Sequence, residues 1–151
     1  MPARNSVKIY VEGGCYHVYN RGVDKRDIYL DDQDYRVFLS FIKQYLSPVE
    51  PNFTHPLSDV TGFHPVRLRQ LKSFYGDVEL LAYCLMPNHF HLLLRQATKD
   101  GMAEFLRALA TSYVMYFNKK YERQGALFQG CIKQLMWGRI HTFCICRDTF
   151  I

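Results

Sequence analysis

The feature that most constrains the fold is a pair of strand-length, apolar segments separated by only two residues. Residues 78–86 are apolar at almost every position, and residues 89–96 form a second β-prone segment directly after Pro87 and Asn88. Two strands joined by so short a connection pair as an antiparallel hairpin. Because the first segment is apolar on both faces, we expect it to be a central strand of its sheet.

Other helix and strand patterns flank this hairpin in a regular order. They are a β-prone segment at 14–20 that ends at Arg21-Gly22, a helical pattern at 35–46 after Asp31 and Asp32, a proline-rich loop at about 47–65, a short helix at about 66–74, a helix at 103–121 and a final strand within 126–136. The order β-α-β-β-α-β predicts an α+β fold: a ferredoxin-like, split antiparallel sheet with its helices on one face.

The composition excludes several classes of protein. The chain has 151 residues, of which 48% are hydrophobic and 22% charged, and these values suit one globular domain. No apolar run reaches the roughly 18 residues of a membrane span. Residues 1–10 have no apolar signal core, and the five cysteines form no CxxC pair, so we expect a cytoplasmic protein without a membrane partner. The net charge of +5 favours a polyanionic partner.

The most informative motif is His89-Phe90-His91 in the second strand of the hairpin. Residues i and i+2 of a strand share a face, so the two imidazoles lie side by side while Phe90 points to the core. Such a pair can bind a divalent cation and leave positions open for another side chain, water or a phosphodiester oxygen. The alternative is two solvated or hydrogen-bonded strand residues. His17 is expected in the core or in contact with a metal ligand, rather than as a ligand itself.

Five sequence blocks resemble the HUH-type, single-tyrosine transposases of insertion sequences, in the branch of REP-associated tyrosine transposases. The blocks are YHVYNRG at 16–22, residues 34–39, LAYCLMPNHFHLLL at 81–94, YFNKKY at 116–121 and GALFQG at 125–130. The resemblance implies a homodimer that acts on single-stranded or hairpin DNA, with His89 and His91 as ligands of Mg²⁺ or Mn²⁺. It also implies a tyrosine on a later helix, whose attack on the scissile phosphate leaves a 5′-phosphotyrosine and a free 3′-hydroxyl.

The chain departs from this family near its end. The family carries its nucleophile after the last strand, in the pattern Arg-Tyr-Ile-x-x-Asn-Pro, whereas no tyrosine follows Tyr121 here. We therefore interpret residues 1–133 as a catalytic-type domain and 134–151 as a frameshifted or truncated tail. The codons of residues 143–151, taken in a shifted frame, permit Leu-His-Leu-Ser-Arg-Tyr-Ile-His, which resembles the missing helix. The gene sequence checks this interpretation.

Tyr113 is the best in-frame substitute for the nucleophile, because it lies on the helix that follows the histidine strand. The alternative is a tyrosine packed on the apolar face of that helix. Tyr116 and Tyr121 are weaker candidates.

Basic and amide side chains are expected to form a DNA-binding surface. The candidates are Asn20, Arg21, Lys25, Arg26, Lys119, Lys120, Arg123 and Gln129. The alternatives are a solvated face for the cations, for which a helix C-terminus is also favourable, and turn capping for the amides.

Two other functions stay open. One is a non-catalytic module that binds single-stranded nucleic acid. The other is a metal-dependent hydrolase, which needs carboxylate ligands that do not flank His89 or His91 closely.

Overall fold

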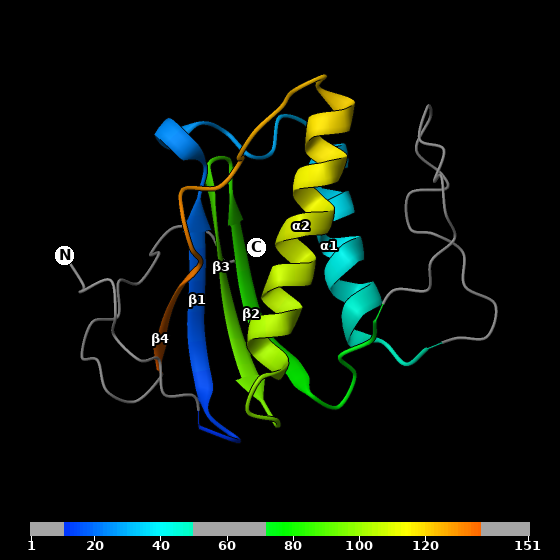
Figure 1. Cartoon of the computed structure of the whole chain (residues 1–151), viewed down its shortest axis with the longest axis vertical. Coiled ribbons are helices and arrows are strands. Elements are labelled where there is room, and N and C mark those ends of the chain that lie inside the picture. Colours follow the sequence, from blue (N-terminus) through cyan, green and yellow to red (C-terminus); the bar gives the residue numbers. More distant parts are fainter. Residues whose placement is uncertain (1–10, 50–71, 137–151) are drawn as a thin grey trace.

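The computed structural model describes residues 11–49 and 72–136 and shows a four-stranded antiparallel sheet with two helices on one of its faces (Figure 1). The elements are β1 (Cys15–Arg21), the 3₁₀ turn η1 (Val23–Lys25), α1 (Asp32–Leu46), β2 (Val78–Met86), β3 (His89–Gln96), α2 (Gly101–Lys120) and β4 (Lys133–Met136). The strand order is β2-β3-β1-β4. The predicted α+β architecture, with helices on one face, is confirmed.

The position of β2 differs from the sequence expectation. Within the described sheet β2 pairs only with β3, so it is an edge strand, and the prediction of a central strand is wrong. Leu81 and Tyr83 are 46% and 53% exposed. An apolar run indicates a central strand only where both of its faces are covered. Neither described helix covers the face that carries Ala82 and Cys84.

The hairpin itself forms as predicted. Met86 of β2 lies opposite His89 of β3, with only Pro87 and Asn88 between them. β3 also pairs antiparallel with β1, which brings Tyr19 opposite His91. β3 is therefore an internal strand, and its alternate residues face the helices and are buried: Phe90, Leu92 and Leu94.

A close backbone contact at Gly22 fixes the end of β1. A Cβ atom at this position would lie 2.2 Å from the carbonyl oxygen of Arg26, so only glycine fits without a shift of the backbone. The amide of Gly22 donates to the carbonyl of Asn88 over 2.9 Å. The end of β1 is thereby fastened to the β2–β3 turn, and Arg21 is held opposite His89.

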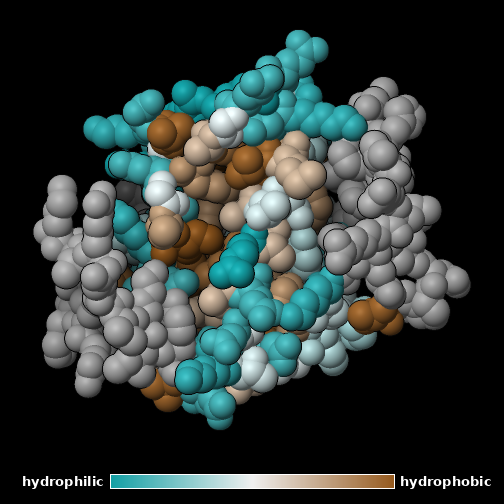
Figure 2. Space-filling view, in the orientation of Figure 1, coloured by the Kyte–Doolittle hydropathy of each residue, from teal (hydrophilic) through white to brown (hydrophobic). Residues whose placement is uncertain are grey.

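The core lies between the sheet and the two helices and is rich in aromatic rings. α1 begins after Asp31, whose carboxylate caps the helix by accepting from the amide of Asp34 over 3.0 Å. The largest fully buried side chains include Phe38, Phe74, Phe90, Phe105, Tyr113 and Phe117. Figure 2 shows apolar residues gathered at the middle of this view and hydrophilic residues at its upper end, where Figure 1 places the end of α2.

Several expectations fall wholly or partly outside the described residues. These are most of the proline-rich loop and of the short helix, which lie in 50–71, and the tail from 137 onward. Residues 72–74 are described and are not helical, and only 133–136 of the expected final strand adopt strand conformation. Among the helices that the structure describes, none is long and apolar enough to cross a membrane.

Candidate metal and nucleic-acid site

Three imidazoles lie together on the face of the sheet that neither described helix covers. The rings of His89 and His91 have centroids 5.0 Å apart and planes at 82°. The ring of His17 on β1 lies 5.0 Å from that of His91, with planes at only 15°. The two-residue spacing therefore places His89 and His91 on one face, as the sequence pattern predicts, and the β1–β3 pairing adds His17.

The hydrogen bond of His89 identifies its free ring nitrogen. His89 Nδ1 lies 2.6 Å from Asn88 Oδ1, while the Nδ2 group of Asn88 donates to the carbonyl of Lys25 over 3.4 Å. An amide oxygen only accepts, so Nδ1 of His89 carries the proton and Nε2 carries the lone pair.

Burial favours the neutral form of all three imidazoles. Desolvation, together with the charges of the neighbouring His17 and His89, lowers the pKa of His91 to about 4. Desolvation also lowers the pKa of His17 and of His89, where the charge of Arg21 adds to the effect. Metals bind the neutral imidazole, so a cation would not have to displace protons from the pair at neutral pH.

The pair fits part of a divalent-cation site. Within residues 11–49 and 72–136, no group of three histidine, cysteine, aspartate or glutamate side chains could hold a metal ion. The other coordination positions would then be left to water or to substrate oxygen. Imidazole donors without a carboxylate suit Mn²⁺ better than Mg²⁺, which prefers oxygen ligands.

Arg21 and Gln129 meet beside the histidines, although they are far apart in sequence. The guanidinium of exposed Arg21 donates to Gln129 Oε1 over 3.1 Å, and the amide of Gln129 donates to the carbonyl of Arg21 over 2.7 Å. Lys25 and Arg26 are exposed in the turn after β1, at the same end of the molecule as the β2–β3 turn (Figure 1). This end therefore presents cations next to the imidazole pair.

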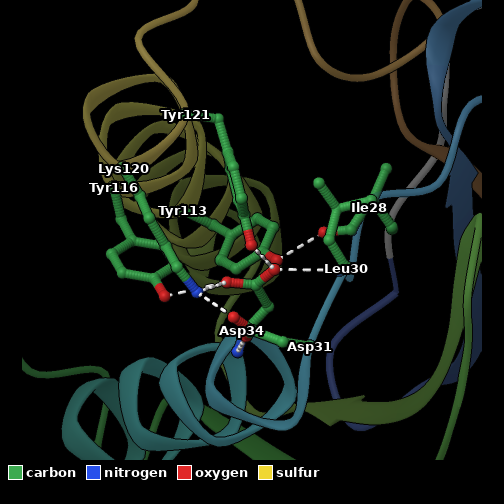
Figure 3. A network of polar contacts seen from close by, with 8 residues as sticks. All are labelled: Ile28, Leu30, Asp31, Asp34, Tyr113, Tyr116, Lys120 and Tyr121. Carbon is green, nitrogen blue, oxygen red and sulfur yellow. Dashed lines mark hydrogen bonds and ion pairs between the residues drawn. The ribbon is translucent and has the colours of Figure 1, made fainter.

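The structure gives the side chains of Asn20 and Lys120 partners within the protein. Asn20 is 3% exposed on the helix-covered face, and its Oδ1 accepts from the amide of Arg21 over 2.9 Å. Lys120 Nζ lies 2.6 Å from the carboxylate of Asp31 and 2.9 Å from that of Asp34 (Figure 3). A phosphate would have to compete with both carboxylates for this ammonium group.

The other two cations near the end of α2, Lys119 and Arg123, lie in different surroundings. Lys119 is exposed. The guanidinium of Arg123 donates to Asn118 Oδ1 over 3.2 Å and lies 5.6 Å from the centroid of the Phe117 ring.

Tyr113 lies on the opposite side of the sheet from the histidine pair. It is fully buried, its ring packs edge-on against Phe38, and its hydroxyl donates to the carbonyl of Ile28 (Figure 3). Burial raises its pKa far above the usual range, the reverse of what a phenol nucleophile needs. The hypothesis that Tyr113 replaces the nucleophile does not fit this placement, whereas the alternative of a packed helix tyrosine does.

Tyr19 also lies at this site, although it was not among the candidates named from the sequence. Its ring stacks 5.8 Å from that of His91 and 5.4 Å from that of His17, and Lys133 Nζ lies 5.7 Å from its centroid. Of the tyrosines in the described strands, it is the one on the histidine-bearing face. The two-residue period of β1 is the signal that could have found it.

The sequence and the fold of this chain are similar to those of known transposases. The family model for IS200-like transposases matches residues 69–148. The fold is similar to that of a REP-associated tyrosine transposase bound to a REP hairpin, with a TM-score of 0.53 and 12% identity, over 89% of this chain and 62% of that one. This chain thus spans less than two thirds of that protein. A protein of Deinococcus radiodurans described as a transposase matches with a TM-score of 0.50 and 16% identity, over 87% of this chain and 84% of that one. No curated protein sequence matches.

Proposed function

Since the chain belongs to the family of IS200-like transposases, we propose that it binds single-stranded or hairpin DNA on the histidine face of its sheet. The complete reaction would be the nicking and rejoining of that DNA through a phosphotyrosine. The observation that carries the proposal is the pair of imidazoles, with ring centroids 5.0 Å apart, beside the exposed guanidinium of Arg21. The structural relative that is bound to a REP hairpin supports a hairpin as the ligand.

Each group at the site has a role in this proposal. Arg21, oriented by Gln129, binds the DNA phosphate through its guanidinium, while Lys25 and Arg26 neutralise neighbouring phosphates. His89 and His91 would hold the divalent cation, Mn²⁺ in preference to Mg²⁺, which supplies a Lewis acid for the scissile phosphate.

The tyrosines on α2 and just after it do not support the covalent step. Tyr113, Tyr116 and Tyr121 all point their hydroxyls into hydrogen bonds with Asp34 of α1 or with the loop before α1 (Figure 3). We propose that the nucleophile belongs to the shifted frame of codons 143–151. In this chain the domain then acts as a module that binds DNA without cutting it.

The test compares this chain with a version in which codons 143–151 are translated in the shifted frame. Both are incubated with a 3′-labelled, hairpin-bearing single strand and Mn²⁺, because a 5′-phosphotyrosine retains the 3′ fragment. We expect both chains to retard the DNA in a gel, and only the frame-restored chain to form an adduct that survives denaturation.

Three outcomes would contradict this proposal. If neither chain binds DNA, the assignment of the histidine face is wrong. Cleavage by this chain without an adduct would instead favour a metal-dependent hydrolase. An adduct formed by this chain itself would show that the nucleophile is present in frame, and its loss in Tyr19→Phe would assign it.

We also propose that the chain forms a homodimer through the β2 edge. Exposed apolar side chains on an edge strand favour pairing with a second sheet, and Leu81 and Tyr83 have this placement. In sedimentation at micromolar concentration we expect a dimer that Leu81→Lys converts to a monomer. The control Met115→Lys, at a 68%-exposed position of α2, should leave the dimer intact. A monomeric unmodified chain would contradict this proposal.

A further inference from the structure

We propose that His17 is a positioning residue, which holds His91 in the tautomer that can bind a metal ion through Nε2. The inference rests on the proposed metal site and deepens it, because it assigns a task to a third histidine. His17 does not act as a ligand in this arrangement; it acts through the ring of His91.

The contact between the two rings is a hydrogen bond at their edges. His17 Nε2 and His91 Nδ1 are 2.9 Å apart, and the ring planes differ by only 15°. A ring N–H lies in the plane of its ring, so nearly parallel rings this close at their nitrogens meet edge to edge. The lone pair of one nitrogen then points at the other nitrogen, and no room is left for a cation between them.

The hydrogen bond allows two arrangements of the proton, and only one leaves His91 able to bind a metal through Nε2. A neutral imidazole has one N–H group. If His91 donates from Nδ1 to His17 Nε2, its own Nε2 is left with a free lone pair. If His17 donates instead, the proton of His91 must sit on Nε2, where it would block a metal. Metal-bound histidines usually donate their other N–H to a nearby acceptor, which is the first arrangement.

His89, the other proposed metal ligand, is also oriented by a hydrogen bond, which comes from a different part of the chain. Asn88 Oδ1 accepts from His89 Nδ1, so His89 also presents Nε2 as its free nitrogen. One partner thus comes from the β2–β3 turn and the other from the neighbouring strand β1. His17 lies in a paired strand and Asn88 in the short turn between two paired strands, so both rings are oriented before any cation arrives.

Two substitutions of His17 separate the hydrogen bond from mere packing. His17→Phe keeps a flat ring but removes the acceptor, whereas the Oε1 atom of His17→Gln can still accept near the position of Nε2. We expect His17→Phe to weaken Mn²⁺ binding by about 10- to 100-fold and His17→Gln to retain most of the affinity. Thermal unfolding of both variants, measured in parallel, reports any loss of packing.

A direct readout of the proton comes from the ¹⁵N resonances of the imidazoles in the metal-free chain. In the unmodified chain and in His17→Gln, we expect the proton of His91 on Nδ1, and in His17→Phe a shift towards the Nε2–H form. A structural role alone would change the melting temperature and leave this tautomer unchanged.

The inference is overturned if His91 carries its proton on Nε2 in the unmodified chain, or if His17→Phe binds Mn²⁺ as tightly as the unmodified chain. Failure of the proposed metal site looks different. The unmodified chain would then bind no Mn²⁺ although His91 is protonated on Nδ1. In that case His17 would still accept the hydrogen bond of His91, but it would have no role in metal binding.

Discussion

Replacing Asp34 with alanine should lower the free energy of unfolding by about 3–5 kcal/mol, because it removes the acceptor for several buried or half-buried donors. The Asp34 side chain is fully buried and accepts from the amide of Leu30 (2.9 Å) and from the hydroxyls of Tyr116 (2.8 Å) and Tyr121 (2.6 Å) (Figure 3). Its carboxylate also lies 2.9 Å from Lys120 Nζ. The substitution leaves these donors without their acceptor, and Lys120 keeps only its ion pair with Asp31.

The network joins the start of α1 to the end of α2, so its loss should loosen the contact between the helices. Urea unfolding followed by circular dichroism measures the change, and the melting temperature should fall by about 2–4 °C for each kcal/mol lost. Asp34→Asn keeps one acceptor oxygen and should cost less. Asp27→Asn, at an exposed loop position, serves as the control and should change stability by no more than about 0.5 kcal/mol. If the free energy of unfolding of Asp34→Ala lies within about 1 kcal/mol of that of the unmodified chain, the network does not stabilise the fold.

The parts of the site that the sequence predicts are those that depend on local geometry. A two-residue connection leaves the strands on either side no choice but to pair, and the period of a strand alone places His89 and His91 on one face. The same period, applied to β1, puts His17 and Tyr19 on a common face. What it cannot provide is the register that brings Tyr19 opposite His91, since this depends on which strands become neighbours.

Where the structure departs from the expectations, the cause is again tertiary pairing and packing. The apolar pattern of β2 is that of a buried strand, yet its place in the sheet is decided by the pairing of β3 with β1. Lys120 has the sequence context of a phosphate-binding lysine, but the fold brings it to Asp31 and Asp34, which lie more than 80 residues earlier in the chain. For Tyr113, tertiary packing separates the hydroxyl from the histidine face, and this packed placement is the alternative that the sequence already offers.

Replacing His89 or His91 with glutamine should abolish most Mn²⁺ binding. Loss of a partner that merely orients a ligand costs about 10- to 100-fold in affinity, so loss of a ligand itself should cost about 100-fold or more. Titration of the chain with Mn²⁺, followed by the electron paramagnetic resonance of the free ion, measures this directly. Arg95→Gln is the matched control: it lies on the same face of β3 and is exposed, and removal of its positive charge does not disfavour a cation.

The pH dependence of the same titration tests the state of the imidazoles. Two ordinary imidazoles with a pKa near 6.5 would both be neutral in only a small fraction of molecules at pH 6. The affinity for Mn²⁺ would therefore be about tenfold lower at pH 6 than at pH 7.5. Here desolvation lowers the pKa of His91 to about 4 and also lowers that of His89, so protons compete less and the fall should be clearly smaller. A tenfold loss, or affinity unchanged in both glutamine variants, would mean that this pair does not form the metal site.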